Sequence, residues 1–311
     1  MDGARGRLPN MNTMSPAIAG NNLPGILAML GGSASFLFND GIIKLIATHM
    51  PLGEIMAVRG AIGTGLLLAA CGWTRTLHWP KGALSTWAFG LLLLGQLGST
   101  LTFVGSLPFL NFADANGIQQ FQPLAITAAS AIFLKESVGW RRWTAALSGL
   151  IGVLFIIKPG TGAFQPYALL AASCVGFVVI RDLGTRAMMP GVPSLMLGLA
   201  SAAIVAIAGL AMRAGETWIE PSPADWLGLA VAAVLLMAGY VLVIRAVRIA
   251  ELSVVSPFRY ASVLYALILQ IAVWGIMPDA LSLLGMAIVV AAGLYTFHRE
   301  QMRQVGLRRR T

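Results

Sequence analysis

The sequence predicts an all-α integral membrane protein with ten transmembrane helices, arranged as two inverted repeats of five helices each. Three observations support this prediction: the composition is apolar, the apolar runs are each about one bilayer thickness long, and the second half repeats features of the first. We place a flexible cytoplasmic tail at residues 1–23, the two five-helix repeats at residues 24–160 and 161–298, and a basic cytoplasmic tail at residues 299–311.

The composition identifies the lipid bilayer as the solvent of this chain. Of its 311 residues, 57% are hydrophobic and 11% are charged, whereas soluble domains contain about 25% charged residues. The net charge of +9 comes from short basic clusters between apolar runs, a pattern typical of membrane topology and not of nucleic-acid binding. Cys71 and Cys174 lack the spacing of a disulfide framework or a metal site, so no metal or other cofactor is expected.

Charge clusters and Pro or Gly residues divide the apolar sequence into segments that can cross a hydrocarbon core of about 30 Å as helices. The predicted spans are residues 24–48, 52–71, 84–107, 112–134, 140–157, 164–188, 191–213, 224–246, 250–273 and 277–298. The first run is too long for the apolar part of a signal peptide. We therefore expect it to stay in the mature protein.

The basic residues predict the orientation. With the N-terminus in the cytoplasm, sixteen of the 21 Lys and Arg residues fall on the inner side, and only Lys158 and Arg213 fall outside. Basic residues accumulate in cytoplasmic loops. We therefore predict a multi-pass protein of the cytoplasmic (inner) membrane with both termini in the cytoplasm.

The two halves show a weak but ordered correspondence. Asp40 and Lys44 in the first span match Asp182 and Arg186 in the sixth, each an acid and a base four residues apart. Five spans per half is an odd number, so the second half enters the membrane from the opposite side. This arrangement is an inverted-topology repeat, which is common among secondary transporters.

Several motifs resemble the EamA type of the drug/metabolite transporter superfamily. They are Asp40 with Lys44, then Pro51, Glu54 and Arg59-Gly60, then Pro123 and Lys135-Glu136, and the glycine-rich fifth span Gly149 to Gly152 that ends in Lys158-Pro159. The resemblance covers about residues 24 to 298. It implies a cavity between spans 1, 3, 4, 6, 8 and 9, with spans 5 and 10 at the periphery. It also implies substrates such as amino acids, including aromatic ones, or vitamins and nucleoside-like metabolites.

Ionisable residues inside spans need a reason, because a charge at the centre of a membrane helix costs about 2.5 to 3.5 kcal/mol on insertion scales. Asp40 and Lys44 lie one helical turn apart, so they can neutralise each other; a role in gating or substrate contact is the alternative. Asp182 and Arg186 hold the matching position near the inner end of the sixth span, where either a structural or a functional role is open.

Two arginines are further candidates. Arg59 in the second span can pair with Glu54 or Asp40. Arg259 lies in the ninth span, and its nearest acidic neighbour in the sequence is Glu251, which is expected close to the membrane surface. If Arg259 faces the cavity, its guanidinium can hold a substrate carboxylate through two hydrogen bonds, or pair with Asp182 between transport cycles.

Neutral polar and aromatic side chains complete the candidate site. Its members are Gln96, Asn116, Gln119, Gln120, Tyr240 and Tyr260. Pro123 follows the polar stretch of the fourth span and frees a backbone carbonyl near it. Each of these residues could instead serve only to join helices.

These features favour a secondary transporter over the other classes. The three histidines lie near span ends, and no HExxH, GxSxG or GxxxxGK[ST] motif is present, so neither an enzyme nor an ATP-driven pump is expected. No filter motif of a channel is visible. Export of amino acids by alternating access is the leading interpretation. Import of a vitamin or nucleoside-like metabolite and multidrug export are the alternatives, and the sequence leaves the oligomeric state open, with a monomer sufficient.

Overall fold

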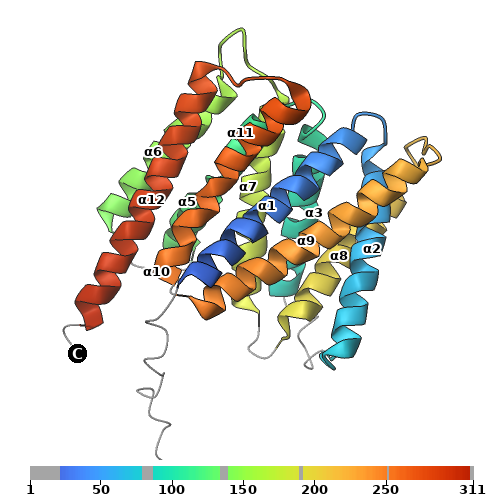
Figure 1. The fold of residues 1–311 in the computed structure, drawn as a ribbon, viewed down its shortest axis with the longest axis horizontal. Helices are drawn as coiled ribbons and strands as arrows, with labels where there is room; N and C mark the ends of the chain where they lie inside the picture. The colour runs from blue at the N-terminus through green and yellow to red at the C-terminus, as the bar shows by residue number, and fades with distance from the viewer. Residues whose placement is uncertain (1–21, 79–86, 134–138, 189–191, 251, 309–311) are drawn as a thin grey trace, which may run out of the picture.

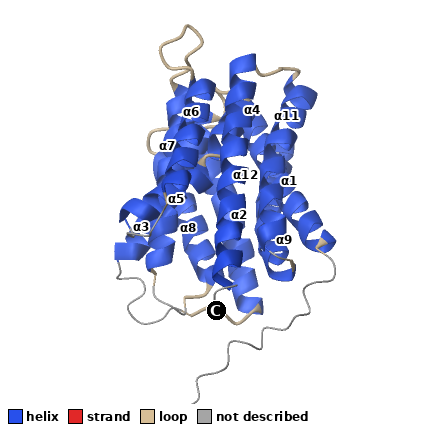
Figure 2. Ribbon diagram, turned by 90° about the vertical axis from the view of Figure 1, so that its left-hand side faces the viewer, coloured by secondary structure: helices blue, strands red, loops and turns tan. Residues whose placement is uncertain are grey.

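The structure, a computed structural model, describes residues 22–78, 87–133, 139–188, 192–250 and 252–308 (Figure 1). Within these ranges the chain consists of helices and loops and contains no strand (Figure 2). The helices are α1 (Leu23–Ile46), α2 (Leu52–Trp73), α3 (Trp87–Ser106), α4 (Phe112–Gln119), α5 (Gln122–Phe133), α6 (Trp140–Ile157), α7 (Tyr167–Ala187), α8 (Ser194–Met212), α9 (Pro223–Ile249), α10 (Leu252–Val255), the 3-10 helix η3 (Ser256–Tyr260), α11 (Ala261–Trp274) and α12 (Ala280–Arg308). The predicted all-helical class is confirmed for this part of the chain.

In the described ranges, nine segments are long and apolar enough to cross a membrane, which makes this a multi-pass membrane protein. Helix α6 occupies the predicted residues 140–157, and α2 begins at the predicted Leu52. Helix α12 continues to Arg308, so most of the tail expected at residues 299–311 is a helical extension of the last span. The tail expected at residues 1–23 lies outside the described residues except for its last two.

The fourth expected span, residues 112–134, is not one helix. Helix α4 ends at Gln119 and α5 begins at Gln122. Between them the N–H groups of Gln120 and Phe121 bond carbonyls three residues back, at 3.2 and 3.1 Å, which is the 3-10 spacing. Pro123 explains the break, because it has no N–H to offer the carbonyl of Gln119 and its ring crowds that carbonyl.

The ninth expected span, residues 250–273, is broken in the same way. It contains α10, η3 and α11 in succession, and Pro257 lies in the first turn of η3. Hydropathy alone predicts a continuous helix here and in the fourth span, and the structure corrects both predictions. The breaks leave irregular backbone inside the bundle, near the ends of α4 and η3.

The most extensive helix pairings each join one helix of the first half to one of the second. They are α1 with α9, α3 with α7, α2 with α8, and α6 with α12. In Figure 1, α6 and α12 lie at one edge of the bundle and α2 and α8 at the other. Glycine permits the closest approach: a Cβ atom at Gly285 would lie 2.5 Å from the Gly152 carbonyl oxygen, and one at Gly152 would lie 2.7 Å from that of Gly285.

The outside of the bundle is apolar, as contact with lipid requires. Large side chains such as Leu227 and Ile268 are exposed on the helices, and Trp73 and Trp140, at a helix end and a helix start, are 91% and 70% exposed, where tryptophan belongs in a membrane interface. The start of α1 and the end of α12 lie at the same end of the bundle (Figures 1 and 2). We call this the terminal end and the opposite one the far end.

Candidate functional site

A cavity of about 380 Å³ lies inside the bundle. Its polar lining consists of Ser33, Asn39, Asp40, Arg59, Ser99, Thr100, Asn116, Gln119, Gln120, Gln122, Cys174, Arg181, Tyr240, Arg259 and Ser262. These residues come from the six elements that the family resemblance implies, namely α1, α3, the broken fourth span, α7, α9 and the broken ninth span. One further residue, Arg59, comes from α2. Small-molecule sites enclose roughly 300–1,000 Å³, so this cavity is suited to a small metabolite.

The charged residues of the cavity are three arginines and one aspartate: Arg59, Arg181, Arg259 and Asp40. Arg181 is paired, because its Nη2 and Nε atoms lie 2.9 and 3.0 Å from Asp182 Oδ1. Even when that pair is counted as neutral, the remaining two arginines outnumber Asp40. The cavity therefore attracts a negatively charged group.

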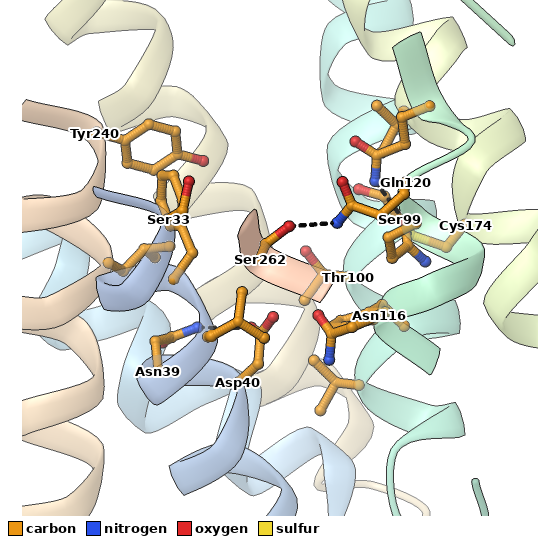
Figure 3. A pocket seen from close by; sticks show the side chains of 18 of the residues that line it. Ser33, Asn39, Asp40, Ser99, Thr100, Asn116, Gln120, Cys174, Tyr240 and Ser262 are labelled. Carbon is orange, nitrogen blue, oxygen red and sulfur yellow. Dashed lines mark hydrogen bonds between the residues drawn. The ribbon is translucent and has the colours of Figure 1, made fainter. Parts of the chain in front are cut away.

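Asp40 is held on α1 by two interactions. Asn39 Nδ2 donates a hydrogen bond of 2.8 Å to Asp40 Oδ1 (Figure 3), and the Arg59 guanidinium attracts the same carboxylate. Glu54, the other partner considered for Arg59, is buried and instead accepts the Ile219 N–H at 3.2 Å. Arg59 therefore interacts with Asp40 through charge, although no salt bridge within 4.0 Å joins them among the described residues.

Arg259 is the charged cavity residue without a protein partner in the described part of the chain. Its side chain is exposed and lines the cavity, and no described residue forms a salt bridge with it. Arg259 lies in η3, whose 3-10 turn is part of the break in the ninth span. Its guanidinium is therefore available to a ligand.

Amides and a hydroxyl join the two broken spans. Gln120 Nε2 donates to Ser262 Oγ at 2.8 Å, and Ser262 Oγ donates to the Arg259 carbonyl oxygen at 2.8 Å. Gln119 Nε2 donates to the Ala171 carbonyl on α7 at 3.0 Å, and Gln119 Oε1 accepts a hydrogen bond from Gln122 Nε2. The polar face of the fourth span is thus hydrogen-bonded to elements on both sides.

Aromatic rings and a buried amide form the rest of the wall. The rings of Tyr240 and Phe36 meet edge to face, with centroids 5.2 Å apart. Asn116 is buried and its Nδ2 bonds the Phe112 carbonyl at 3.0 Å. Figure 3 shows Tyr240 and Asn116 on opposite sides of the cavity.

The cavity is closed toward the far end. There α4 packs against α11: the Ala113 N–H donates to Gln270 Oε1 at 2.6 Å, and the Phe112 ring stacks on Trp274 with centroids 5.3 Å apart. In the described chain, α5 and α10, which lie on the other side of the two breaks, show no comparable packing. The far side of the cavity is therefore sealed more tightly than the terminal side.

Lys44 does not line the cavity. It is buried, and its ammonium lies 2.5 Å from each of the carbonyl oxygens of Leu107 and Leu110 and 5.6 Å from the Trp274 ring centroid. The neutralising pair expected between Asp40 and Lys44 is not formed. Both carbonyls belong to the turn between α3 and α4, where no regular helix supplies their partners, and the flexible lysine side chain reaches them.

Three other candidates also lie outside the lining. Gln96 bonds Thr100 within α3 at 3.2 Å. The Tyr260 hydroxyl packs directly against Gly293 of α12. Asp182 pairs with the neighbouring Arg181, and the side chain of its expected partner Arg186 lies outside the described residues. The structure thus brings together Asp40, Arg59, Asn116, Gln119, Gln120, Tyr240 and Arg259 from the predicted set.

Sequence reasoning did not single out Arg181, Asn39, Ser262 and Cys174 as cavity residues. The weak internal correspondence contains a signal for two of them, because Arg181-Asp182 in the second half aligns with Asn39-Asp40 in the first. No such signal marks Ser262. Among the described residues, no group of His, Cys, Asp and Glu is arranged to hold a metal ion. The described lining offers charged groups, amides and aromatic faces to a ligand.

Comparison with known families matches the same family to each half of the chain. The EamA-like transporter family matches residues 23–158 and again residues 165–297.

Curated relatives of this chain are bacterial transporters. An S-adenosylmethionine uptake transporter of Rickettsia prowazekii is 25% identical over 296 residues, covering 90% of this chain and 94% of the relative. A pseudopaline exporter of Pseudomonas aeruginosa is 23% identical, covering 86% and 94%. A riboflavin transporter of Vibrio cholerae is 28% identical over a shorter stretch, 54% of this chain and 56% of its own.

A solved crystal structure shares the fold. Its TM-score to this chain is 0.60 at 20% sequence identity, and the match covers 88% of this chain and 98% of the other.

Proposed function

This chain belongs to the EamA-like transporter family, and we propose that it is a secondary transporter of small organic metabolites that carry a carboxylate group. Its family and its relatives make it a transporter and not an enzyme. The observation that carries the substrate proposal is the charge of the cavity, where Arg259 has no protein partner in the described chain and the arginines outnumber Asp40.

The chemistry of these side chains favours an amino acid. A guanidinium binds a carboxylate through two parallel hydrogen bonds, so Arg259 would hold the acid end. Asp40 would face the amino group, and Phe36 with Tyr240 would flank the side chain. We propose export of amino acids, aromatic ones included. Import of a vitamin or nucleoside-like metabolite is the alternative, and a multidrug exporter of cations fits the basic cavity less well.

We further propose ten spans in two inverted repeats. The two family matches divide the chain into corresponding halves, and α4 with α5 together supply the tenth span. The helix pairings support the same symmetry. The proposed counterparts in the two halves are α1 and α7, α2 and α8, α3 and α9, and α6 and α12. When each helix is replaced by its counterpart, the pairing of α1 with α9 becomes that of α7 with α3, and the pairings of α2 with α8 and α6 with α12 are unchanged.

The proposed membrane is the cytoplasmic one, with the terminal end of the bundle in the cytoplasm. The distribution of Lys and Arg supports this orientation. The far end then faces outward, and the cavity, closed on that side, would open outward and inward in turn. One chain encloses the whole cavity, so a monomer is sufficient for transport.

Counterflow in proteoliposomes tests the function. Vesicles containing the purified protein are loaded with one compound and offered its labelled form, over a panel of amino acids, flavins, nucleosides, S-adenosylmethionine and cationic drugs. We expect exchange of a carboxylate-bearing member, lost in Arg259→Gln and retained in Arg213→Gln, which removes an arginine outside the cavity. Exchange of cationic drugs alone would refute the proposal.

A further inference from the structure

The two broken spans meet at a single hydrogen-bonded chain beside the cavity. Gln120, at the end of α4, donates from Nε2 to Ser262 Oγ at 2.8 Å (Figure 3). Ser262, in the first turn of α11, donates to the Arg259 carbonyl at 2.8 Å. The chain connects residues from the two halves of the sequence. It ends on the backbone of the arginine whose side chain enters the cavity.

The hydroxyl of Ser262 both donates and accepts in this chain. A serine hydroxyl has one hydrogen to donate, and here it goes to the carbonyl of Arg259, while the oxygen accepts from Gln120. Ser262 is only 6% exposed, so little of its side chain is open to water. Bonds of this kind polarise one another in a protein interior, and the direction of each one is fixed.

Arg259 needs such support because regular helix geometry does not hold it. It lies in η3, where the hydrogen-bond geometry is poorer than in an α-helix, and its side chain has no salt-bridge partner in the described chain. Gln120 sits on a firm base, since Ile118 and Leu124 on either side of the break are almost completely buried. The position of the Arg259 backbone therefore depends on the fourth span.

We propose that Ser262 and Gln120 are positioning residues, which fix Arg259 so that its guanidinium meets the substrate carboxylate. This inference rests on the proposed function. It adds that the carboxylate subsite is assembled from both halves of the chain: Arg259 contacts the substrate, and Gln120 acts on Arg259 through Ser262.

Transport kinetics with an acid and its amide test the role. The probes are L-phenylalanine, L-methionine, S-adenosylmethionine and riboflavin in counterflow, followed by the carboxamide of whichever acid exchanges. One hydrogen bond is worth about 0.5–1.5 kcal/mol, so Ser262→Ala should raise KM for the acid by roughly 2- to 10-fold with Vmax retained. The KM for the carboxamide should not change, and Ser262→Thr, which keeps a hydroxyl, should behave as the wild type. An equal loss for acid and carboxamide would overturn the proposal.

Hydrogen exchange tests the hydrogen-bonded chain without any substrate. In Ser262→Ala and in Gln120→Met, the backbone amides of residues 256–262 should exchange several-fold faster than in the wild type. Ser35→Ala is the matched control, because Ser35 is also a buried helical serine bonded to a carbonyl, that of Gly31 at 2.9 Å, and lies outside the cavity lining. Unchanged exchange in both test variants would refute the positioning role.

The outcomes for the two proposals are separable. If Arg259→Gln abolishes exchange of the acid while Ser262→Ala and Gln120→Met leave its KM unchanged, the positioning role fails and the transport function stands. If the wild type exchanges none of the probes or panel compounds, the proposed function fails. The hydrogen-exchange result then still shows whether the chain of hydrogen bonds holds Arg259.

Discussion

Replacement of Lys44 by methionine should destabilise the far end of the bundle more than it impairs transport. Lys44 is 7% exposed, and its ammonium lies 2.5 Å from each of two carbonyl oxygens, those of Leu107 and Leu110. It thereby closes the turn between α3 and α4. Methionine keeps most of the apolar stem but provides no donor, so both carbonyls lose this partner.

The loss of stability in Lys44→Met is the difference between two opposing contributions, the lost hydrogen bonds and the recovered desolvation cost. A hydrogen bond to a charged group contributes about 1.5–3 kcal/mol, so the two bonds together contribute roughly 3–6 kcal/mol. Removal of the ammonium also recovers its desolvation cost, which is several kcal/mol for a buried ion. We expect a net loss of about 1–3 kcal/mol, and a fall in unfolding temperature of roughly 2–6 °C.

Thermal unfolding in detergent and counterflow per folded molecule together check this prediction. Arg141→Met, at an exposed site beside Trp140, should change stability by no more than about 0.5 kcal/mol. Lys44→Gln, which restores one neutral donor, should fall between the wild type and Lys44→Met. An unchanged unfolding temperature with transport lost in Lys44→Met would refute the reasoning and place Lys44 in the transport cycle.

Three further predictions concern packing, pH and topology. Gly285→Ala places a methyl group 2.5 Å from a carbonyl oxygen of α6 and should cost about 1–3 kcal/mol in thermal unfolding, whereas Gly90→Ala, with nothing within 4 Å, should not destabilise. Partial burial alone would raise the pKa of Asp279, but hydrogen bonds from Lys158 and from the Ser282 N–H hold this pKa below its ordinary value of 3.8. The ionised carboxylate of Asp279 therefore contributes stability above pH 3.8, and this contribution is lost as the pH falls through the lowered pKa of the folded state. The difference in unfolding temperature between the wild type and Asp279→Asn should shrink over the same pH range. Reporter fusions after Leu77 and at the C-terminus should give cytoplasmic signals, and a periplasmic signal at either point would reverse the orientation.

Much of the helical framework could be predicted because hydropathy and charge act locally. Trp140 and Lys158 mark the ends of α6, since a basic cluster precedes the apolar run and a proline follows it. The breaks could not be predicted in the same way. Pro123 and Pro257 are visible in the sequence, but membrane helices tolerate proline when neighbours satisfy the freed backbone groups. Whether a proline interrupts a span therefore depends on partners far away in the chain.

The same limit applies to the site. A charge inside a span is costly enough to stand out, so Asp40, Arg59 and Arg259 could be selected from sequence. Lys44 could not be assigned correctly. A spacing of four residues reveals Asp40 as a neighbour but does not reveal the carbonyls of the turn between α3 and α4, which lie more than 60 residues away. Ser262 carries no sequence signal, since its importance lies only in what it touches.

The position of the hydrogen-bonded chain relative to the seal constrains how access can alternate. On the far side of the breaks, α4 and α11 are joined through Ala113 and Gln270, and on the terminal side the described parts of α5 and α10 lack comparable packing. Opening of the far end would require α4 and α11 to separate. Closure of the terminal end would require α5 and α10 to approach each other. Both movements can occur with little displacement at the level of Gln120 and Ser262, which lies between them. The proposed carboxylate subsite at Arg259 would then keep its geometry while the two ends exchange roles, as the proposed alternating-access carrier requires.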